Sequence, residues 1–133
     1  PNFLNQANRA KEVEAKNQLG AINRAQQSFR LDHTAFSSDS SFSDLNIGLK
    51  TAGENYNFSL DAGGSNSALA TADAQDTSLT GYSGAIALDS QGAVAMGICK
   101  SAGGATAGAA PDINTGTPEI TTNANVESCE GGS

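Results

Sequence analysis

The sequence predicts an α+β fold in which one long N-terminal α-helix packs on a four-stranded antiparallel β-sheet. Three observations predict this class. Apolar residues recur at helical spacing from Ala15 to Phe36 within a predicted helix of residues 1–36. Strand-like alternation begins at residue 55, and two cysteines bracket a stretch of small residues near the C-terminus. The 133 residues suffice for a single domain. Residues 37–54 would then be a loop between helix and sheet, residues 55–99 the sheet, and residues 100–133 a disulfide-bounded C-terminal loop region.

The expected helix carries one apolar stripe with two polar interruptions. Its members lie three or four residues apart, and they are Ala15, Leu19, Ile22, Gln26, Phe29, His33 and Phe36. Leu4 lies on the same face, but Asn8 and Lys11 follow it there. Residues 1–14 therefore have little to bury against their own domain. Because a polar helical end is only marginally stable alone in water, we interpret it as a stalk that continues an upstream helix or packs on neighbouring subunits.

Four strands are expected after the loop. Tyr56, Phe58 and Leu60 alternate with polar residues, which predicts one buried and one solvated face. Residues 68–74 predict a weak strand of small residues, and residues 82–88 and 94–98 predict the third and fourth strands. The predicted helix–sheet core consists of the large apolar side chains of these elements: Leu19, Ile22, Phe29, Phe36, Tyr56, Phe58, Leu60, Ile86, Leu88, Val94, Met96 and Ile98.

Two cysteines, Cys99 and Cys129, flank residues 101–128, which are rich in Gly, Ala and Thr. Without a C-x-x-C motif and with one histidine in the chain, a zinc site is not expected. Cys99 has the parity opposite to that of Val94 and Ile98, so it should face away from the helix, where a returning tail could reach it. This pattern favours a disulfide, and with it an oxidising location, over two unpaired thiols. A disulfide would tether a loop that is too polar to order itself.

Charge is distributed unevenly along the chain. The net charge is −7, with +2 on residues 1–36 and −9 on residues 37–133. An acidic chain disfavours non-specific binding of nucleic acid, and no specific nucleic-acid partner is predicted. The asymmetry fits an ordinary acidic domain with a mixed-charge helix. It also fits attraction between the two parts in neighbouring copies of an assembly. The candidate assembly contacts in that case are the basic residues of the helix: Arg9, Lys11, Lys16, Arg24 and Arg30.

No set of residues matches a catalytic or metal-binding pattern. His33 lies near the helix C-terminus beside Asp32, where a structural or capping role is expected. No G-x-S-x-G elbow accompanies it. The acids Asp73, Asp76 and Asp89 do not match the spacing of an EF-hand loop. We therefore expect neither an enzyme nor a cofactor nor a metal ion. A surface calcium site and a hydrolase pocket around His33 are the alternatives.

Several segments resemble a known family. The opening Pro1-Asn2-Phe3-Leu4 resembles the point in type IV pilins where the apolar, membrane-embedded half of the long helix ends. Residues 15–27, AKNQLGAINRAQQ, are similar to the helix of cyanobacterial type IV pilin-like proteins, a group related to secretion pseudopilins G and H. Residues 54–60, ENYNFSL, continue this similarity into the first strand. The two late cysteines resemble the disulfide-bounded C-terminal region of many pilins.

This resemblance implies a pilin fold and a structural role in a type IV pilus, a surface filament for twitching motility, adhesion and DNA uptake. It implies three kinds of partner: copies of the chain and other pilins, the pilus assembly machinery, and the inner membrane. The membrane would be reached through an apolar helical segment upstream of Pro1, of which this chain would be the soluble continuation. An extracellular filament, anchored in the inner membrane before assembly, is the implied location. The alternatives are a type II secretion pseudopilin and a soluble exported adhesive or ligand-binding module.

Overall fold

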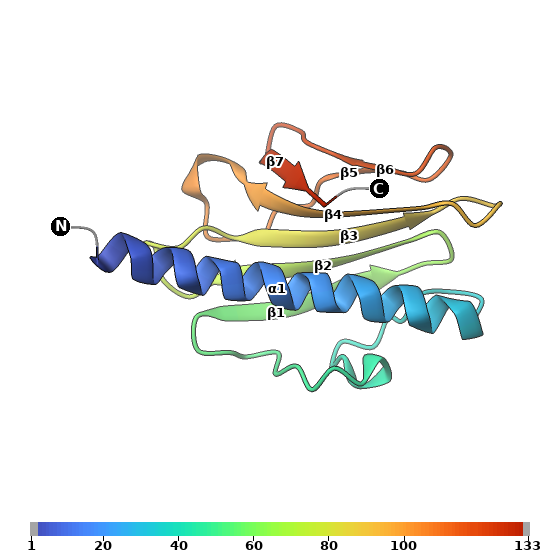
Figure 1. The fold of residues 1–133 in the computed structure, drawn as a ribbon, viewed down its shortest axis with the longest axis horizontal. Coiled ribbons are helices and arrows are strands. Elements are labelled where there is room, and N and C mark those ends of the chain that lie inside the picture. The colour runs from blue at the N-terminus through green and yellow to red at the C-terminus, as the bar shows by residue number, and fades with distance from the viewer. Residues whose placement is uncertain (1–2, 132–133) are drawn as a thin grey trace.

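The computed structural model describes residues 3–131, in which a single long helix lies across one face of an antiparallel sheet (Figure 1). The helix is α1 (Phe3–Asp32), and the sheet has the strand order β1-β2-β3-β4-β7. Its strands are β1 (Tyr56–Gly63), β2 (Ser67–Ala74), β3 (Tyr82–Leu88), β4 (Val94–Ser101) and β7 (Val126–Glu130). The remaining elements are a hairpin of β5 (Asp112–Asn114) and β6 (Glu119–Thr121) and the 3-10 turns η1 (Ser43–Leu45) and η2 (Ala102–Gly104). The predicted α+β class and helix-on-sheet packing are confirmed, with five strands instead of four.

One stripe of α1 faces the sheet. Its buried residues are Ala15, Leu19, Ile22, Asn23 and Gln26. The helix comes close to β3 because Gly84 has no side chain, since a Cβ at this position would lie 3.1 Å from the Cβ of Leu19. Asn23 reaches the next strand, where its Nδ2 donates to the carbonyl oxygen of Gly97 at 3.3 Å. The stripe is therefore apolar where it crosses the sheet and polar where it can pair with backbone.

The helix ends at Asp32, four residues before the predicted end. The His33 Nδ1 atom lies 2.8 Å from the carbonyl oxygen of Phe29, and the two rings stack with centroids 3.8 Å apart. The chain then turns back, and the backbone N–H of Phe36 donates to the carbonyl oxygen of Gly64 at 2.8 Å. Phe36 is buried as predicted, but it enters the core from this turn and not from the helical stripe.

A buried amide fixes the chain just after the helix. Gln26 Nε2 donates to the carbonyl oxygen of Ser37 at 2.9 Å, and the N–H of Ser37 donates back to Gln26 Oε1 at 2.8 Å. Both residues are buried. Because each buried polar group of the pair has a partner, Gln26 can occupy an otherwise apolar stripe without an unpaired amide. The polar interruption in the stripe is thus the point that holds the returning chain.

The predicted core residues divide into two sets by burial. The buried set is Leu19, Ile22, Phe36, Tyr56, Phe58 and Ile86. The half-buried set is Phe29, Leu60, Leu88, Val94, Met96 and Ile98, all packed against the buried clusters. The loop between helix and sheet contributes Phe42 and Leu45, and the segment before β3 contributes Leu79. The core on this side of the sheet thus takes large side chains from the helix, the loop and the strands together.

The C-terminal region returns to the sheet as its fifth strand. β7 pairs antiparallel with β4, and Cys99 lies opposite Cys129 in this register. The predicted disulfide between these two residues is confirmed. It joins two neighbouring strands within the sheet, whereas the sequence suggested a tail that crosses the outer face to reach Cys99.

The outer face of the sheet is covered by a second layer, which begins with residues 102–111, called here the strap. The carbonyl oxygen of Thr106 accepts from the N–H of Ala74 at 2.8 Å, and that of Ala105 accepts from the N–H of Gly81 at 2.8 Å. Gly108 N–H donates to Asp73 Oδ1 at 2.7 Å. The sequence predicted a surface loop tethered by the disulfide over this stretch. The strap is instead bound to the sheet through its own backbone.

The β5–β6 hairpin completes the outer layer. Ile120 of β6 lies over Gly97 of β4, where a Cβ would come within 2.8 Å of the Ile120 side chain. The outer-face cluster consists mainly of small and medium side chains: Leu69, Ala85, Ala87, Ala95, Cys99, Ile120 and Val126. β3 and β4 are therefore covered on both faces, by the helix on one side and by the strap and hairpin on the other.

Candidate assembly surface

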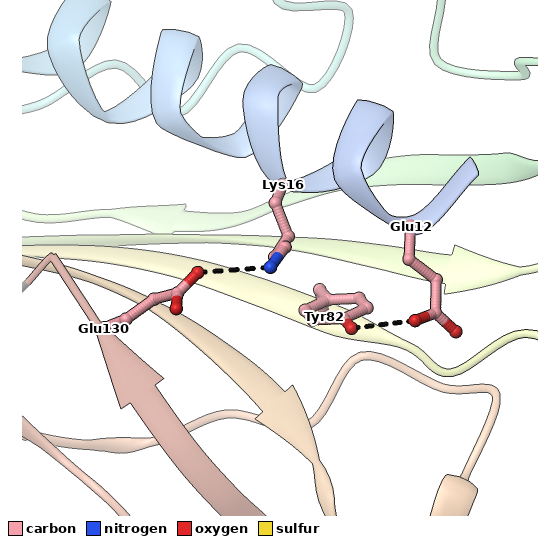
Figure 2. Close-up of polar contacts among 4 residues, drawn as sticks. All are labelled: Glu12, Lys16, Tyr82 and Glu130. Atoms are coloured by element: carbon pink, nitrogen blue, oxygen red, sulfur yellow. Dashed lines mark hydrogen bonds and ion pairs between the residues drawn. The ribbon is translucent and has the colours of Figure 1, made fainter. Parts of the chain in front are cut away.

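The side of α1 nearest β4 and β7 carries a group of polar contacts between helix and sheet (Figure 2). Glu12 Oε1 accepts from the Tyr82 hydroxyl at 3.1 Å, and Glu12 Oε2 accepts from the N–H of Thr80 at 3.0 Å. Lys16 Nζ lies 3.2 Å from Glu130 Oε1 and 5.8 Å from the centroid of the Tyr82 ring. These contacts attach the helix to the sheet at the point where the helix first reaches it.

Two tyrosines beneath this part of the helix act as hydrogen-bond donors. Burial raises the pKa of Tyr82, and the carboxylate of Glu12 raises it further. Burial raises the pKa of Tyr56 in the same way, with smaller contributions from Glu12 and Tyr82. The Tyr56 hydroxyl donates to the carbonyl oxygen of Thr80 at 2.6 Å. Both phenols therefore stay protonated over the physiological pH range, and the contacts they make do not switch with pH.

The candidate assembly contacts of the helix fall into two groups. Lys16 is paired with Glu130, and Arg30 donates to the carbonyl oxygens of Ser65 and His33 at 3.1 and 2.8 Å. Lys16 and Arg30 therefore form contacts within their own domain.

The other three bases are available to other molecules to different degrees. Arg9 and Arg24 are exposed, and Lys11 is half-buried beside a groove at the β1 side of the helix. Within residues 3–131, the side chains of these three bases form no hydrogen bond or ion pair of the kind that occupies Lys16 and Arg30. Arg9 and Arg24 are therefore the bases whose charge a neighbouring molecule can meet most directly.

The N-terminal part of α1 extends past the sheet (Figure 1). No side chain of residues 3–14 is buried. Phe3 and Leu4 are 86% and 71% exposed, which is unusual for large apolar side chains at adjacent positions. Val13 and, near the other end of the helix, Leu31 are also exposed. Exposed apolar side chains next to each other mark a surface suited to contact with another molecule.

The surroundings of His33 do not assemble a catalytic triad. A groove of about 640 Å³ runs past His33, Asp44 and Ser43. The Ser43 hydroxyl donates to Asp39, while His33 Nδ1 is occupied by the carbonyl oxygen of Phe29. No hydrogen bond joins His33 to Ser43 or Asp44 in the described part of the chain. The geometry therefore supports the capping role for His33.

Acidic residues do not gather into a metal site either. Over residues 3–131, no three or more His, Cys, Asp or Glu side chains are placed to hold a metal ion together. The Asp39 carboxylate instead accepts hydrogen bonds from the serine hydroxyls of its own loop. Hydrogen bonds from Ser43 and Ser41 lower the pKa of Asp39 to about 2.

None of the described helical residues forms a stretch that is both long and apolar enough to cross a membrane.

Comparison with known proteins gives one match. A protein-family model described as type IV pilin-like G and H matches residues 12–128. No curated protein matches the chain, and no solved structure matches it. The matched residues run from Glu12 of α1 to Ser128 within β7. They therefore include the part of the helix that lies over the sheet, strands β1 to β4, the strap and the β5–β6 hairpin.

Proposed function

The chain belongs to the type IV pilin-like G and H family, and from this we propose that it is a structural subunit of a type IV pilus. In this role, the domain forms part of a surface filament for motility, adhesion or DNA uptake. Its partners are copies of itself and other pilins, together with the pilus assembly machinery. Before assembly, an apolar helical segment would hold it in the inner membrane.

The observation that carries this proposal is the stalk formed by the first part of α1. Residues 3–10, which precede the Glu12 contact, are helical yet bury no side chain in their own domain. An isolated helical end of this composition gains little from propensity alone, so packing against something else is needed to stabilise it. In a filament, neighbouring subunits supply that packing.

Charge supports the same arrangement. Arg9 and Arg24 are exposed bases on the helix, and the sheet side of the domain is strongly acidic. Contacts between helix bases of one copy and acids of the next would be attractive and would orient the copies before they pack. Lys11 joins this group, whereas Lys16 and Arg30 act within the domain.

The direct test is to locate the full-length protein in its own cells. Immunogold labelling with an antibody against this domain should decorate surface filaments, and deletion of the gene should remove them or change their number. Protein confined to the periplasm would contradict the pilus role and would point to a secretion pseudopilin.

The charge component has its own test. The double variant Arg9→Glu with Arg24→Glu should reduce the number of filaments several-fold, because both side chains are exposed and neither forms an ion pair within residues 3–131. The melting temperature of the isolated domain should stay within about 2 °C of the parent, as expected for surface substitutions. Normal piliation by this variant would remove the electrostatic part of the proposal and leave the filament role standing.

A further inference from the structure

A groove lies at the far end of α1 from the stalk, and we call it the distal groove. It measures about 440 Å³ and opens between the end of the helix and the β3–β4 turn. Phe36 and Ile86 are buried, and Leu88 and Val94 are half-buried beside them. Leu31 stands at the edge of the groove and is 83% exposed. The lining therefore combines these apolar side chains with the uncharged polar residues Gln27, Asn66 and Ser90.

The charged groups of the distal groove, Arg30 and Asp89, are hydrogen-bonded to backbone groups of their own chain. Arg30 donates to the carbonyl oxygens of Ser65 and His33. Asp89 Oδ1 accepts from the N–H groups of Gln91 and Ala93, both at 2.8 Å. The two groups carry opposite charges, so the lining has no net charge to attract a charged occupant, which would also lose hydration here. The groove therefore favours an uncharged segment with apolar side chains.

The chain itself offers such a segment at the other end of the same helix. Phe3 and Leu4 are exposed, adjacent and apolar, and residues 3–8 carry no charge. At a rise of about 1.5 Å per residue, the helix separates Phe3 from Leu31 by about 42 Å. α1 runs without interruption over this distance (Figure 1), so a copy cannot place Phe3 in its own groove.

We propose that the distal groove of each copy receives Phe3 and Leu4 of a second copy. The proposal rests on the filament role and specifies one contact within it. The aromatic ring and the leucine side chain would fill the apolar groove beside Leu31, as anchor residues do at the centre of protein interfaces. The helices of two copies in contact would be displaced by about 42 Å along the helix direction, given the rise of an α-helix.

This contact has a consequence for assembly. It joins two different surfaces, so each copy in a pair still has one free stalk and one free groove. Contacts of this head-to-tail kind extend into open chains unless the geometry closes them into a ring. A two-fold contact, for example two copies that bury Leu31 in each other's groove, would stop at a dimer.

The test uses cysteine cross-linking in filaments of the full-length protein. One variant carries both Leu4→Cys and Leu88→Cys, so each copy holds a thiol on the stalk and another in the groove. Oxidation of assembled filaments should give a ladder of dimers, trimers and higher multimers on a non-reducing gel. Reduction should return the ladder to monomer, and mass spectrometry should identify the peptide of residue 4 linked to that of residue 88.

The matched control carries Val13→Cys with Leu88→Cys. Val13 is also an exposed apolar residue of α1, but at about 1.5 Å per residue it lies about 14 Å along the helix from Leu4 and should give monomer only. Filaments that form normally but yield no ladder with Leu4→Cys would overturn the groove contact and leave the filament role intact. A product that stops at dimer would overturn it in favour of a two-fold contact. Absence of filaments from cells with the unaltered protein would overturn the filament role and the contact together.

A second pair of variants measures the contact without cross-linking. Phe3→Ser with Leu4→Ser should abolish or strongly reduce filament formation, while the isolated domain keeps its melting temperature because both side chains are exposed. Val13→Ser, the matched control, should leave filament number unchanged. Normal filaments from the Phe3→Ser, Leu4→Ser variant would contradict the proposal.

Discussion

The two faces of the sheet are covered by different means. On one face, α1 packs large side chains such as Leu19 and Ile22 against Tyr56 and Phe58. On the other face, the strap and the β5–β6 hairpin lie on a surface of small residues, and backbone hydrogen bonds hold them there. The helix-covered face thus depends on apolar area, and the strap-covered face depends on close backbone approach and a covalent tether.

The difference predicts how each face responds to mutation. Burial of a leucine or isoleucine side chain contributes about 1.5–3 kcal/mol, whereas a typical internal hydrogen bond contributes about 0.5–1.5 kcal/mol net. Removal of volume should therefore be most harmful beneath the helix. Addition of volume should be most harmful beneath the strap, where no space is left for a side chain.

The largest effect is expected from Leu19→Ala. Leu19 is fully buried where α1 crosses the sheet, and its truncation leaves a cavity that the rigid helix and sheet cannot close. The free energy of unfolding should fall by about 2–5 kcal/mol. Chemical denaturation of the isolated domain measures this, with Val13→Ala as the exposed control on the same helix. Equal stability of the two variants would show that the helix-covered face does not depend on apolar area.

Removal of the disulfide should come next. Replacement of Cys99 and Cys129 by serine frees β7 and the ordered strap, and should lower the free energy of unfolding by about 2–4 kcal/mol. Hydrogen exchange should accelerate more in β4 and β7 than in β1 and β2, because the bond constrains the strap-covered side. Uniform acceleration over the whole sheet would show instead that the two sides unfold as one unit.

A smaller loss is expected from Gly108→Ala in the strap. A Cβ at this position would overlap the carbonyl oxygen of Tyr82, so the strap would have to move off the sheet. The cost should be about 1–3 kcal/mol, as for other overpacked sites. Gly116→Ala is the matched control, because the nearest atom to its Cβ is 3.6 Å away. If both variants melt alike, the strap is not held closely to the sheet.

The smallest effect is expected at acid pH, from Asp39 in the loop after α1, which covers neither face of the sheet. The pKa of Asp39 is lowered from 3.8 to about 2 by hydrogen bonds from Ser43 and Ser41. A lowered carboxyl pKa stabilises the folded state above the unfolded value of 3.8, and this contribution is lost as the pH falls towards about 2. NMR titration should therefore give a midpoint near 2 for Asp39.

The same loop can be tested through stability. The melting temperature of Asp39→Asn should depend less on pH across this acid range than that of the parent protein. Asp32→Asn serves as the control, because Asp32 is exposed and its carboxylate accepts no hydrogen bond of this kind within residues 3–131. A midpoint close to 3.8 for Asp39 would contradict the hydrogen-bond pattern of the loop.

The helix-covered face was predictable because its residues are large and periodic. The stripe from Ala15 to Phe29 and the alternation in β1 follow the periods of helix and strand, which residue spacing detects directly. The end of the helix was not predictable in this way. His33 and Phe36 continue the spacing of the stripe, but one stacks on Phe29 and the other returns to the core through the turn.

The strap-covered face escaped prediction for a physical reason. Ala85, Ala87 and Gly97 are too small to stand out as a buried pattern, although with their larger neighbours they form nearly continuous apolar runs in β3 and β4, which is the signal that both faces are covered. The strap binds through backbone groups, which every residue has. Composition alone therefore suggested a surface loop tethered by the disulfide.

The candidate assembly residues could also be predicted only in part from the sequence. The sequence identifies the basic residues of the helix but not which of them are already paired. Lys16 and Glu130 lie 114 positions apart in the chain, and only the return of β7 brings them together. The groove at the end of α1 likewise combines segments that are distant in sequence, so the site that we propose for Phe3 and Leu4 becomes visible only in three dimensions.

The bond between Cys99 and Cys129 also changes what a single cut in the chain can do. It closes a covalent ring over a sequence separation of 30 residues, and the whole strap and hairpin lie inside that ring. A protease that cleaves one peptide bond between the two cysteines opens the ring but releases no fragment. The C-terminal piece stays attached through sulfur and remains paired with β4. A protein exposed to extracellular proteases would thus persist after such a cut as two chains in one fold.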